Sequence, residues 1–308
     1  MEISKGIIPA AGLGTGFLPY TKTVPREMLP ILNKPVIQHL IEECLEAEIS
    51  QFFIITNRRK NAISDYFDTL SEIELTLTER KQYDLLTSTE RLVRLGSYAY
   101  IRQPEPLGVG HAVLLAKRCF NKEYFGVALP DDLIDAKEPV LKQLTRVARQ
   151  EKACVIAVHE VPSAQINSQS IIGIKKSFSS ALMQVGSITD NPTLKCASSN
   201  LAVLGRYILS SKIFPVLEYL NNFSEKRELS LNDAINQMVH DGERVIAYKI
   251  QGTRYDLRTP LGWLKAIVSV GLKNPAYAPH LRALIESSYD CPRPTSYSPA
   301  RSLDQPML

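Results

Sequence analysis

The chain has 308 residues, with little cysteine and little net charge. Its five cysteines lie far apart and show no CxxC spacing, which argues against a disulfide framework or a structural zinc site and favours reduced thiols. Lysine and arginine number 36 against 32 acidic residues, and the small excess is spread along the chain. Because a nucleic-acid-binding protein normally concentrates its basic residues in one patch, nucleic acid is not an expected partner.

Long apolar runs are also missing. No run reaches the roughly 20 residues that a membrane-spanning helix needs, and the first residues include no apolar segment typical of a secretory signal. We therefore expect a cytoplasmic protein that does not contact a membrane. The composition, 44% hydrophobic and 22% charged, is average for globular chains and excludes a collagen-like, coiled-coil or disordered protein.

In the first half, short apolar runs alternate with stretches of helical periodicity. Uniformly apolar short runs are typical of strands buried on both faces of a parallel sheet, and their alternation with helices predicts βαβ units. The predicted strands are 6–10, 52–56, 98–101, 125–129 and 154–158. The predicted helices are 36–47, 61–69, 110–116 and 140–149.

The second half is less regular. Residues 163–200 are rich in Ser, Asn and Gln and predict hairpins and loops over the sheet edge. Further predicted elements are strands at 200–207 and 244–250 and helices at 231–239, 261–270 and 279–287. We expect one domain over 1–288. Residues 289–308, rich in Pro and Ser, predict a disordered tail.

A glycine-rich loop, AGLGTG at 11–16, follows the first predicted strand. In a doubly wound fold such a loop can present backbone N–H groups to a phosphate, although a flexible turn would have the same composition. The next segment carries Lys22, Arg26 and Lys34 and is stiffened by prolines. A long connection of this kind between a strand and a helix is more typical of a binding site than of a tight turn.

The segment AAGLGTGFLPYTKTVPREMLPILNKPVIQHLIEECLEA resembles the N-terminal signature of bacterial UTP–glucose-1-phosphate uridylyltransferases, in the sugar nucleotidyltransferase superfamily. Further blocks agree in order: RQPEPLGVGHAVLLA (102–116), ALPDDLID (128–135), SSNLAVLGRYIL (198–209) with ELSLNDAI (228–235), and TRYDLRTPLGW (253–263). The resemblance covers about residues 3–288. It implies a Rossmann-like nucleotidyltransferase fold with a mixed, mostly parallel sheet flanked by helices, and a homo-oligomer. Within the single domain it implies a nucleotide-binding part at about 1–135 and a sugar-binding and dimerisation part at about 136–288. It also implies the activity: UTP and glucose 1-phosphate would give UDP-glucose and pyrophosphate.

The resemblance also implies site residues. Those on the nucleotide side are Ala10, Ala11, Gly12, Gly14, Glu27, Gln103 and Gly108. Those on the sugar-phosphate side are Asp190, Asn191, Asn200, Glu228 and Arg258. The catalytic set is Arg26, Asp131 and Asp256, and the two aspartates would hold Mg²⁺, which prefers hard oxygen ligands.

Each assignment has an ordinary structural alternative. Asp131 could be a turn or capping residue, Asp256 a surface acid, and Gln103 and Gly108 plain loop residues. His111 is more typical of a packing or capping residue than of a catalytic one, and the single tryptophan, Trp263, of a core residue.

Several positions depart from the related signature, and three of these departures change a charge. Gly16 and Asn191 stand where it has an arginine and a lysine, and Arg258 stands where it has a glycine. Losing one preorganised donor at such a site costs about 10²- to 10³-fold in rate, and restoring the two cations is expected to raise kcat. Arg258 could replace the lost lysine electrostatically or occupy the cation site itself.

These departures leave three hypotheses open. The first is an active uridylyltransferase in which the lost cations are compensated. The second is a catalytically impaired paralogue that binds uridine nucleotide and regulates or partners an active pyrophosphorylase. The third is a related enzyme for another sugar phosphate or nucleotide.

Overall fold

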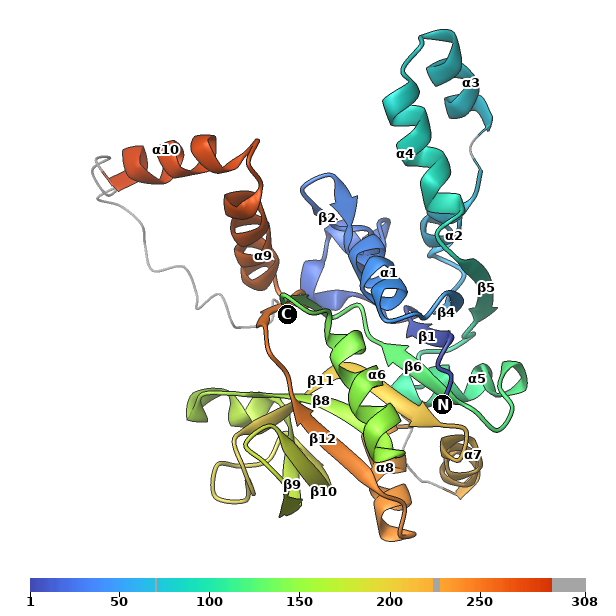
Figure 1. Cartoon of the computed structure of the whole chain (residues 1–308), viewed down its shortest axis with the longest axis vertical. Coiled ribbons are helices and arrows are strands. Elements are labelled where there is room, and N and C mark those ends of the chain that lie inside the picture. Colours follow the sequence, from blue (N-terminus) through green and yellow to red (C-terminus); the bar gives the residue numbers. More distant parts are fainter. Residues whose placement is uncertain (70, 224–227, 290–308) are drawn as a thin grey trace.

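The computed structural model describes residues 1–69, 71–223 and 228–289. A nine-stranded mixed sheet runs through the middle of the molecule (Figure 1). Its strands are, in spatial order, β5 (Ser97–Arg102), β4 (Gln51–Thr56), β1 (Lys5–Pro9), β6 (Tyr124–Ala128), β11 (Leu201–Ser210), β8 (Cys154–Glu160), β12 (Val245–Lys249), β10 (Leu182–Asp190) and β9 (Ser170–Ser177). The prediction of an α/β protein with a mixed sheet is confirmed.

The N-terminal part of the sheet is parallel and covered on both faces. β1 pairs in parallel with β4 and with β6, and β4 pairs in parallel with β5. Ile7 and Ile8 of β1 are fully buried in different core clusters, because successive side chains point to opposite faces. Ile8 faces α1 (Val36–Glu46), α2 (Asn61–Phe67) and α6 (Val140–Glu151), whereas Ile7 faces α5 (Val109–Leu115), α7 (Ile213–Phe223) and α8 (Leu231–His240).

The other end of the sheet differs from the open, doubly wound arrangement expected. β11 runs antiparallel to both β6 and β8, and β9 and β10 form the predicted edge hairpin. Ala202 of β11 also pairs with Ile171 of β9, which closes β11, β8, β12, β10 and β9 into a ring. Register shifts around Val185 interrupt the β9–β10 ladder, and such irregularities bend a strand enough to allow closure.

Two short antiparallel ribbons were not predicted. β2 (Pro30–Ile31) pairs with β3 (Lys34–Pro35), and β7 (Asp132–Asp135) pairs with β13 (Thr253–Asp256). The second ribbon sets Asp132 opposite Asp256, and the N–H of Leu257 donates to the carbonyl of Asp131 at 2.8 Å. It therefore brings the segment after β6 and the segment after β12 to one place.

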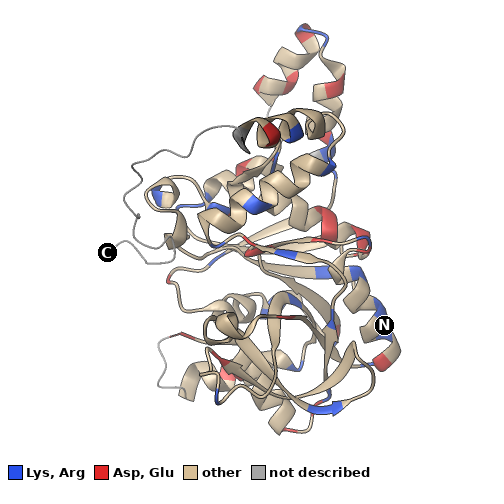
Figure 2. Ribbon diagram, turned by 90° about the vertical axis from the view of Figure 1, so that its left-hand side faces the viewer, with Lys and Arg blue, Asp and Glu red and all other residues tan. Residues whose placement is uncertain are grey.

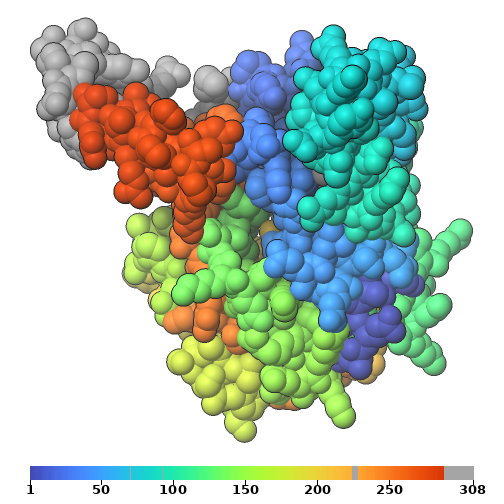
Figure 3. All heavy atoms as spheres, turned by 45° about the horizontal axis from the view of Figure 1, so that its top comes forward, coloured from blue at the N-terminus to red at the C-terminus, as the bar shows by residue number. Residues whose placement is uncertain are grey.

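Two helical pairs extend away from the sheet. The hairpin of α3 (Ser71–Glu79) and α4 (Tyr83–Val93) projects from one end (Figures 1 and 3), and the sequence did not predict it. Helices α9 (Pro260–Lys273) and α10 (Ala278–Tyr289) were predicted. Tyr289 ends α10, and the rest of the expected tail, 290–308, lies outside the described residues.

Four smaller expectations concern Trp263, the cysteines, membrane-spanning helices and the distribution of charge. Trp263 on α9 is partly buried, meets Phe17 edge-on at 6.1 Å between ring centroids and donates to the Pro30 carbonyl at 3.1 Å, which confirms its packing role. Cys44, Cys119, Cys154 and Cys196 have free thiols, whereas Cys291 is outside the described part. Within that part, no helix is both long and apolar enough to cross a membrane. In Figure 2 basic and acidic residues are interspersed along the ribbon, as expected from a small excess of basic residues that is spread along the chain.

Candidate active site

A cavity of about 390 Å³ brings together residues that lie far apart in the sequence, from Gly108 to Arg258. Its lining includes residues that the sequence assigned to the nucleotide, to the metal and to the sugar phosphate, namely Gly108, Asp131, Asp190, Asn191, Glu228 and Arg258. Asn200 does not belong to the described lining; it is exposed, and its carbonyl accepts the N–H of Val161 at 2.9 Å.

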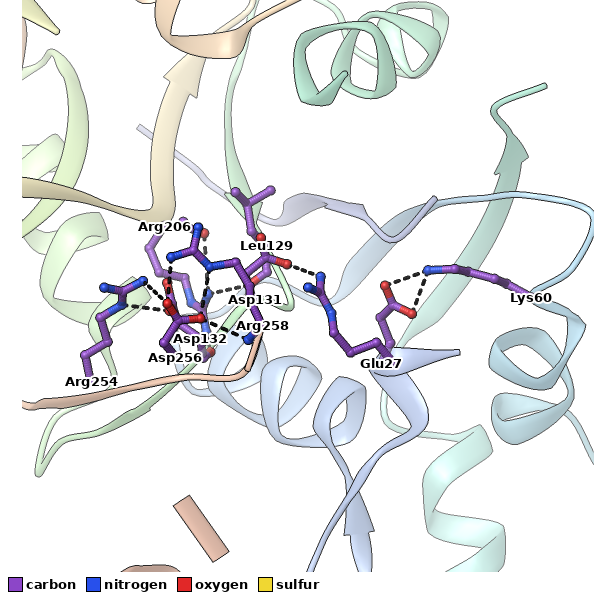
Figure 4. Close-up of polar contacts among 11 residues, drawn as sticks. Glu27, Lys60, Leu129, Asp131, Asp132, Arg206, Arg254, Asp256 and Arg258 are labelled. Atoms are coloured by element: carbon purple, nitrogen blue, oxygen red, sulfur yellow. Dashed lines mark hydrogen bonds and ion pairs between the residues drawn. The ribbon is translucent and has the colours of Figure 1, made fainter. Parts of the chain in front are cut away.

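Three aspartates and three arginines form a paired cluster at one wall of this cavity (Figure 4). Arg26 donates to Asp131, and Arg254 donates to Asp132 at 2.7 Å. Arg258 holds both oxygens of Asp256, with Nε 2.9 Å from Oδ1 and Nη2 2.6 Å from Oδ2. The ribbon of β7 and β13 positions this cluster, because it carries Asp132, Arg254 and Asp256.

The environment shifts the pKa of the cluster members in different directions. Burial raises the pKa of the Asp132 carboxyl, although Arg254 acts against this. Burial would also raise the pKa of Asp256, but the hydrogen bonds and charge of Arg258, assisted by Arg254, outweigh it and hold that pKa below its ordinary value. The same hydrogen bonds raise the pKa of the Arg258 guanidinium. Asp256 and Arg258 are therefore a fully charged pair at neutral pH.

The predicted metal ligands suit Mg²⁺ in kind but not in their present arrangement. Carboxylate oxygens are the ligands that this ion prefers. Both oxygens of Asp256 accept N–H groups of Arg258, and one oxygen of Asp131 accepts Arg26. Of the four carboxylate oxygens of Asp131 and Asp256, only the second oxygen of Asp131 accepts no hydrogen bond from a described residue. A site with two carboxylate ligands would therefore require Arg258 to leave Asp256.

The glycine-rich loop is fixed at its start by β4. The N–H of Ala10 donates to the carbonyl of Ile55 at 2.7 Å, and the amide of Asn57 donates to the carbonyl of Ala11 at 2.8 Å. Gly12 is exposed, and Gly14 adopts a left-handed conformation with φ 66°. The N–H of Ala10 is thus committed to the sheet.

Glu27 lies in the interior instead of facing the cavity. Its side chain is 1% exposed, and both of its oxygens accept the ammonium of Lys60 at 2.7 Å. Burial lowers the pKa of Lys60, and Glu27 acts in the opposite direction. Glu27 therefore holds Lys60 in the interior and does not itself line the cavity.

Gln103 and Gly108, which the resemblance assigned to the nucleotide side, are in direct contact. The amide nitrogen of Gln103 donates to the carbonyl of Gly108 at 3.1 Å and lies 2.9 Å from Nδ1 of His111. Gly108 has φ 92°, and a Cβ atom there would lie 2.6 Å from the carbonyl oxygen of Leu229. The sequence predicted a packing or capping role for His111, and it missed this contact with Gln103.

Several members of the site escaped the sequence analysis. Asp132 follows the nominated Asp131 directly, so the repeated acid was an available signal. Lys60 ends a basic run after β4. In contrast, nothing in the local sequence pattern indicates that Arg254 pairs with Asp132. Asn232 on α8 also lines the cavity and donates to Asp190 at 2.8 Å and Ser170 at 3.1 Å.

Comparison with known proteins assigns this arrangement to a family. The family described as nucleotidyl transferase matches residues 5–266. A UTP–glucose-1-phosphate uridylyltransferase of Staphylococcus epidermidis is 39% identical over 285 residues, which cover 92% of this chain and 98% of that protein.

Solved structures agree with this assignment. The UTP-bound UGPase of Acinetobacter baumannii is 36% identical with a TM-score of 0.85, and the match covers 92% of this chain and 99% of that one. A UDP-glucose pyrophosphorylase complexed with UDP-glucose is 33% identical with a TM-score of 0.78, covering 89% of this chain and 100% of that one. This chain belongs to the nucleotidyl transferase family, among the UTP–glucose-1-phosphate uridylyltransferases.

Proposed function

We propose that this protein transfers the uridylyl group of UTP to glucose 1-phosphate. An oxygen of the sugar phosphate forms a bond to the α-phosphorus of UTP, the bond from that phosphorus to the bridging oxygen of the β-phosphate breaks, and pyrophosphate leaves. The observation that carries the proposal is the cavity: it joins the base-side loop at Gly108, the charged cluster at Asp131 and the sugar-side residues Asp190 and Glu228. The family assignment supports the same reaction.

Gln103 is proposed to read the base. In the tautomer of His111 that carries its proton on Nε2, both hydrogens of the Gln103 amide are used, on Gly108 and on Nδ1 of His111, so Oε1 of Gln103 is left as the acceptor. Uracil presents an N3–H donor to such an acceptor, whereas cytosine presents a lone pair at N3. The orientation of the amide therefore favours uracil over cytosine. Ala10, Ala11, Gly12 and Gly14 are proposed to border the nucleotide.

The arginines of the cluster are proposed to neutralise the phosphates. Transfer of this kind depends on positioning and on charge stabilisation, because the protein does little covalent chemistry. Arg26 and Arg258 supply two guanidinium groups beside the cavity. Mg²⁺ held by Asp131 and Asp256 remains a prediction from the resemblance, and it requires Arg258 to withdraw from Asp256.

The sugar hydroxyls are proposed to meet acceptors on the far wall. Asp190 accepts Ser170 at 2.6 Å and Asn232 at 2.8 Å on one oxygen, and Glu228 is an exposed carboxylate on the same cavity. Asn191 contributes a neutral side chain next to Asp190. Since the structure puts Asn200 outside this lining, we omit it from the proposed sugar contacts.

The proposal is tested by pyrophosphate release from purified protein with UTP or CTP, Mg²⁺ and a panel of sugar 1-phosphates. We expect fastest release with UTP and glucose 1-phosphate. The variant Asp131→Asn should lose at least about 100-fold in rate with an unchanged melting temperature. A different preferred sugar would support the third hypothesis, in which the substrate differs. UTP binding without release from any pair would support the impaired paralogue, which nothing among the compared proteins favours.

A further inference from the structure

The carboxylate of Asp256 is already paired with a cationic side chain, the guanidinium of Arg258. Its oxygens accept four N–H groups: the backbone N–H of Arg258 at 2.9 Å, Nε of Arg258 at 2.9 Å, Nη2 of Arg258 at 2.6 Å and Nη2 of Arg254 at 3.5 Å. A carboxylate offers about four lone-pair positions. The Asp256 carboxylate therefore has no position left for a metal while Arg258 stays in place.

Arg258 is the arginine of the cluster with the most room to move. Its side chain is 41% exposed, against 13% for Arg26 and 11% for Arg254, and it lines the cavity. A partly exposed ion pair costs less to break than a buried one, because water can replace the contacts that are lost. The guanidinium can therefore leave Asp256 for the cavity without disturbing the buried pair of Arg254 and Asp132.

We propose that Arg258 competes with the divalent cation for Asp256. Without nucleotide, the guanidinium holds the carboxylate and repels a second cation, so the metal binds weakly. When nucleotide phosphates and a divalent cation occupy the site, Arg258 would leave Asp256 and face the cavity, which Asn191 also lines and where the related signature has a lysine. The proposal rests on the proposed function in taking Asp131 and Asp256 as the metal ligands.

The test measures Mn²⁺ affinity by electron paramagnetic resonance on protein without nucleotide. Wild type is compared with Arg258→Gln, which keeps much of the length but not the charge, and with Arg258→Ala. The matched control is Arg146→Ala, because Arg146 is also paired with both oxygens of one carboxylate, Glu138, at 2.6 and 2.7 Å, but lies on α6 away from the cavity. Circular dichroism verifies that each variant is folded.

We expect both Arg258 variants to bind Mn²⁺ at least about tenfold tighter than wild type, because removing a unit charge in contact with the site removes its repulsion. The control should be unchanged, and adding Asp256→Asn to Arg258→Gln should cancel the gain. Equal affinity in wild type and both variants, or a gain that survives Asp256→Asn, would overturn the proposal.

Calorimetry with UTP on the same samples separates this proposal from the proposed function. If wild type binds UTP but the Arg258 variants bind Mn²⁺ no more tightly than wild type does, the competition alone is overturned. A wild type that does not bind UTP overturns the proposed function, and the Mn²⁺ comparison still decides the competition between Arg258 and the metal.

Discussion

The carbonyl oxygen of Arg258 fills the space beside Gly16: a Cβ atom on residue 16 would lie 2.2 Å from it. Gly16 is not among the glycines with positive φ, so space and not backbone conformation requires glycine here. Two positions that depart from the related signature, 16 and 258, are therefore in contact, but through the main-chain carbonyl of residue 258 and not through its side chain. An arginine cannot be restored at position 16 unless the turn after β13 moves.

The first prediction follows from that contact. Gly16→Ala should lower the free energy of unfolding by about 1–3 kcal/mol, the usual cost of forcing atoms into a filled space. Gly12→Ala is the control, because a Cβ atom there meets nothing within 4 Å. Urea unfolding measures both variants, and equal stabilities would contradict the steric account. Gly16→Arg has the same obstacle, so it should not restore rate, contrary to the expectation from sequence.

The second prediction concerns Asn191. It lines the cavity in a left-handed conformation, with φ 48°. Asn191→Lys should raise kcat with glucose 1-phosphate at least about tenfold, because a charge that acts more strongly in the transition state appears in kcat. Asn191→Gln has a similar backbone cost, about 1 kcal/mol of stability, but adds no charge. Steady-state kinetics on both variants separates the effect of the charge from that of the backbone. An equal kcat in the two variants would show that the added charge has no effect.

The sequence predicted those elements whose pattern is local. The strand predicted at 6–10 is found as β1 (Lys5–Pro9). It could be predicted because a strand buried on both faces is a continuous apolar run in the sequence. The hairpin of α3 and α4 escaped detection: none of the described side chains of α3 is buried, so its apolar residues form no core-facing stripe. The closed ring escaped as well, since it depends on the pairing of Ala202 with Ile171.

The candidate site shows the same division. Asp131 and Gly108 could be nominated from motifs, and both line the cavity. Their partners could not be, because Arg254 meets Asp132 across 122 positions of the chain and Lys60 meets Glu27 across 33. Such pairs are set by the packing of β7 on β13 and of the loops after β1 and β4, which no local spacing encodes.

The third prediction tests the buried pair of Glu27 and Lys60. Their side chains are 1% and 6% exposed. Lys60→Met should cost about 3–5 kcal/mol of stability, because it leaves the carboxylate of Glu27 buried without a partner. Combining it with Glu27→Gln should recover much of that loss. A double-mutant cycle by urea unfolding measures the coupling, and additive losses would show that the two side chains act independently.

The last prediction is that His111 sets the orientation of the Gln103 side-chain amide. Burial lowers the pKa of His111, so its ring is neutral at pH 7 and Nδ1 can accept the amide of Gln103, 2.9 Å away. His111→Phe removes that acceptor, the amide can then reverse, and the preference for UTP over CTP should fall about tenfold, a change of about 1.4 kcal/mol.

The pH dependence of that preference distinguishes orientation from simple packing. Because the pKa of His111 is lowered in the folded protein, the neutral form is the one that folding favours, and acid works against it. Protonation would set an N–H against the amide N–H of Gln103, so the wild-type preference for UTP should decline as the pH falls from about 8 to about 5. The preference of His111→Phe should stay flat over that range, and Gln103→Ala should show little preference at any pH. Calorimetric affinities for UTP and CTP across this range provide the measurement. A phenylalanine variant that keeps the wild-type preference and its decline would show that another group orients the amide.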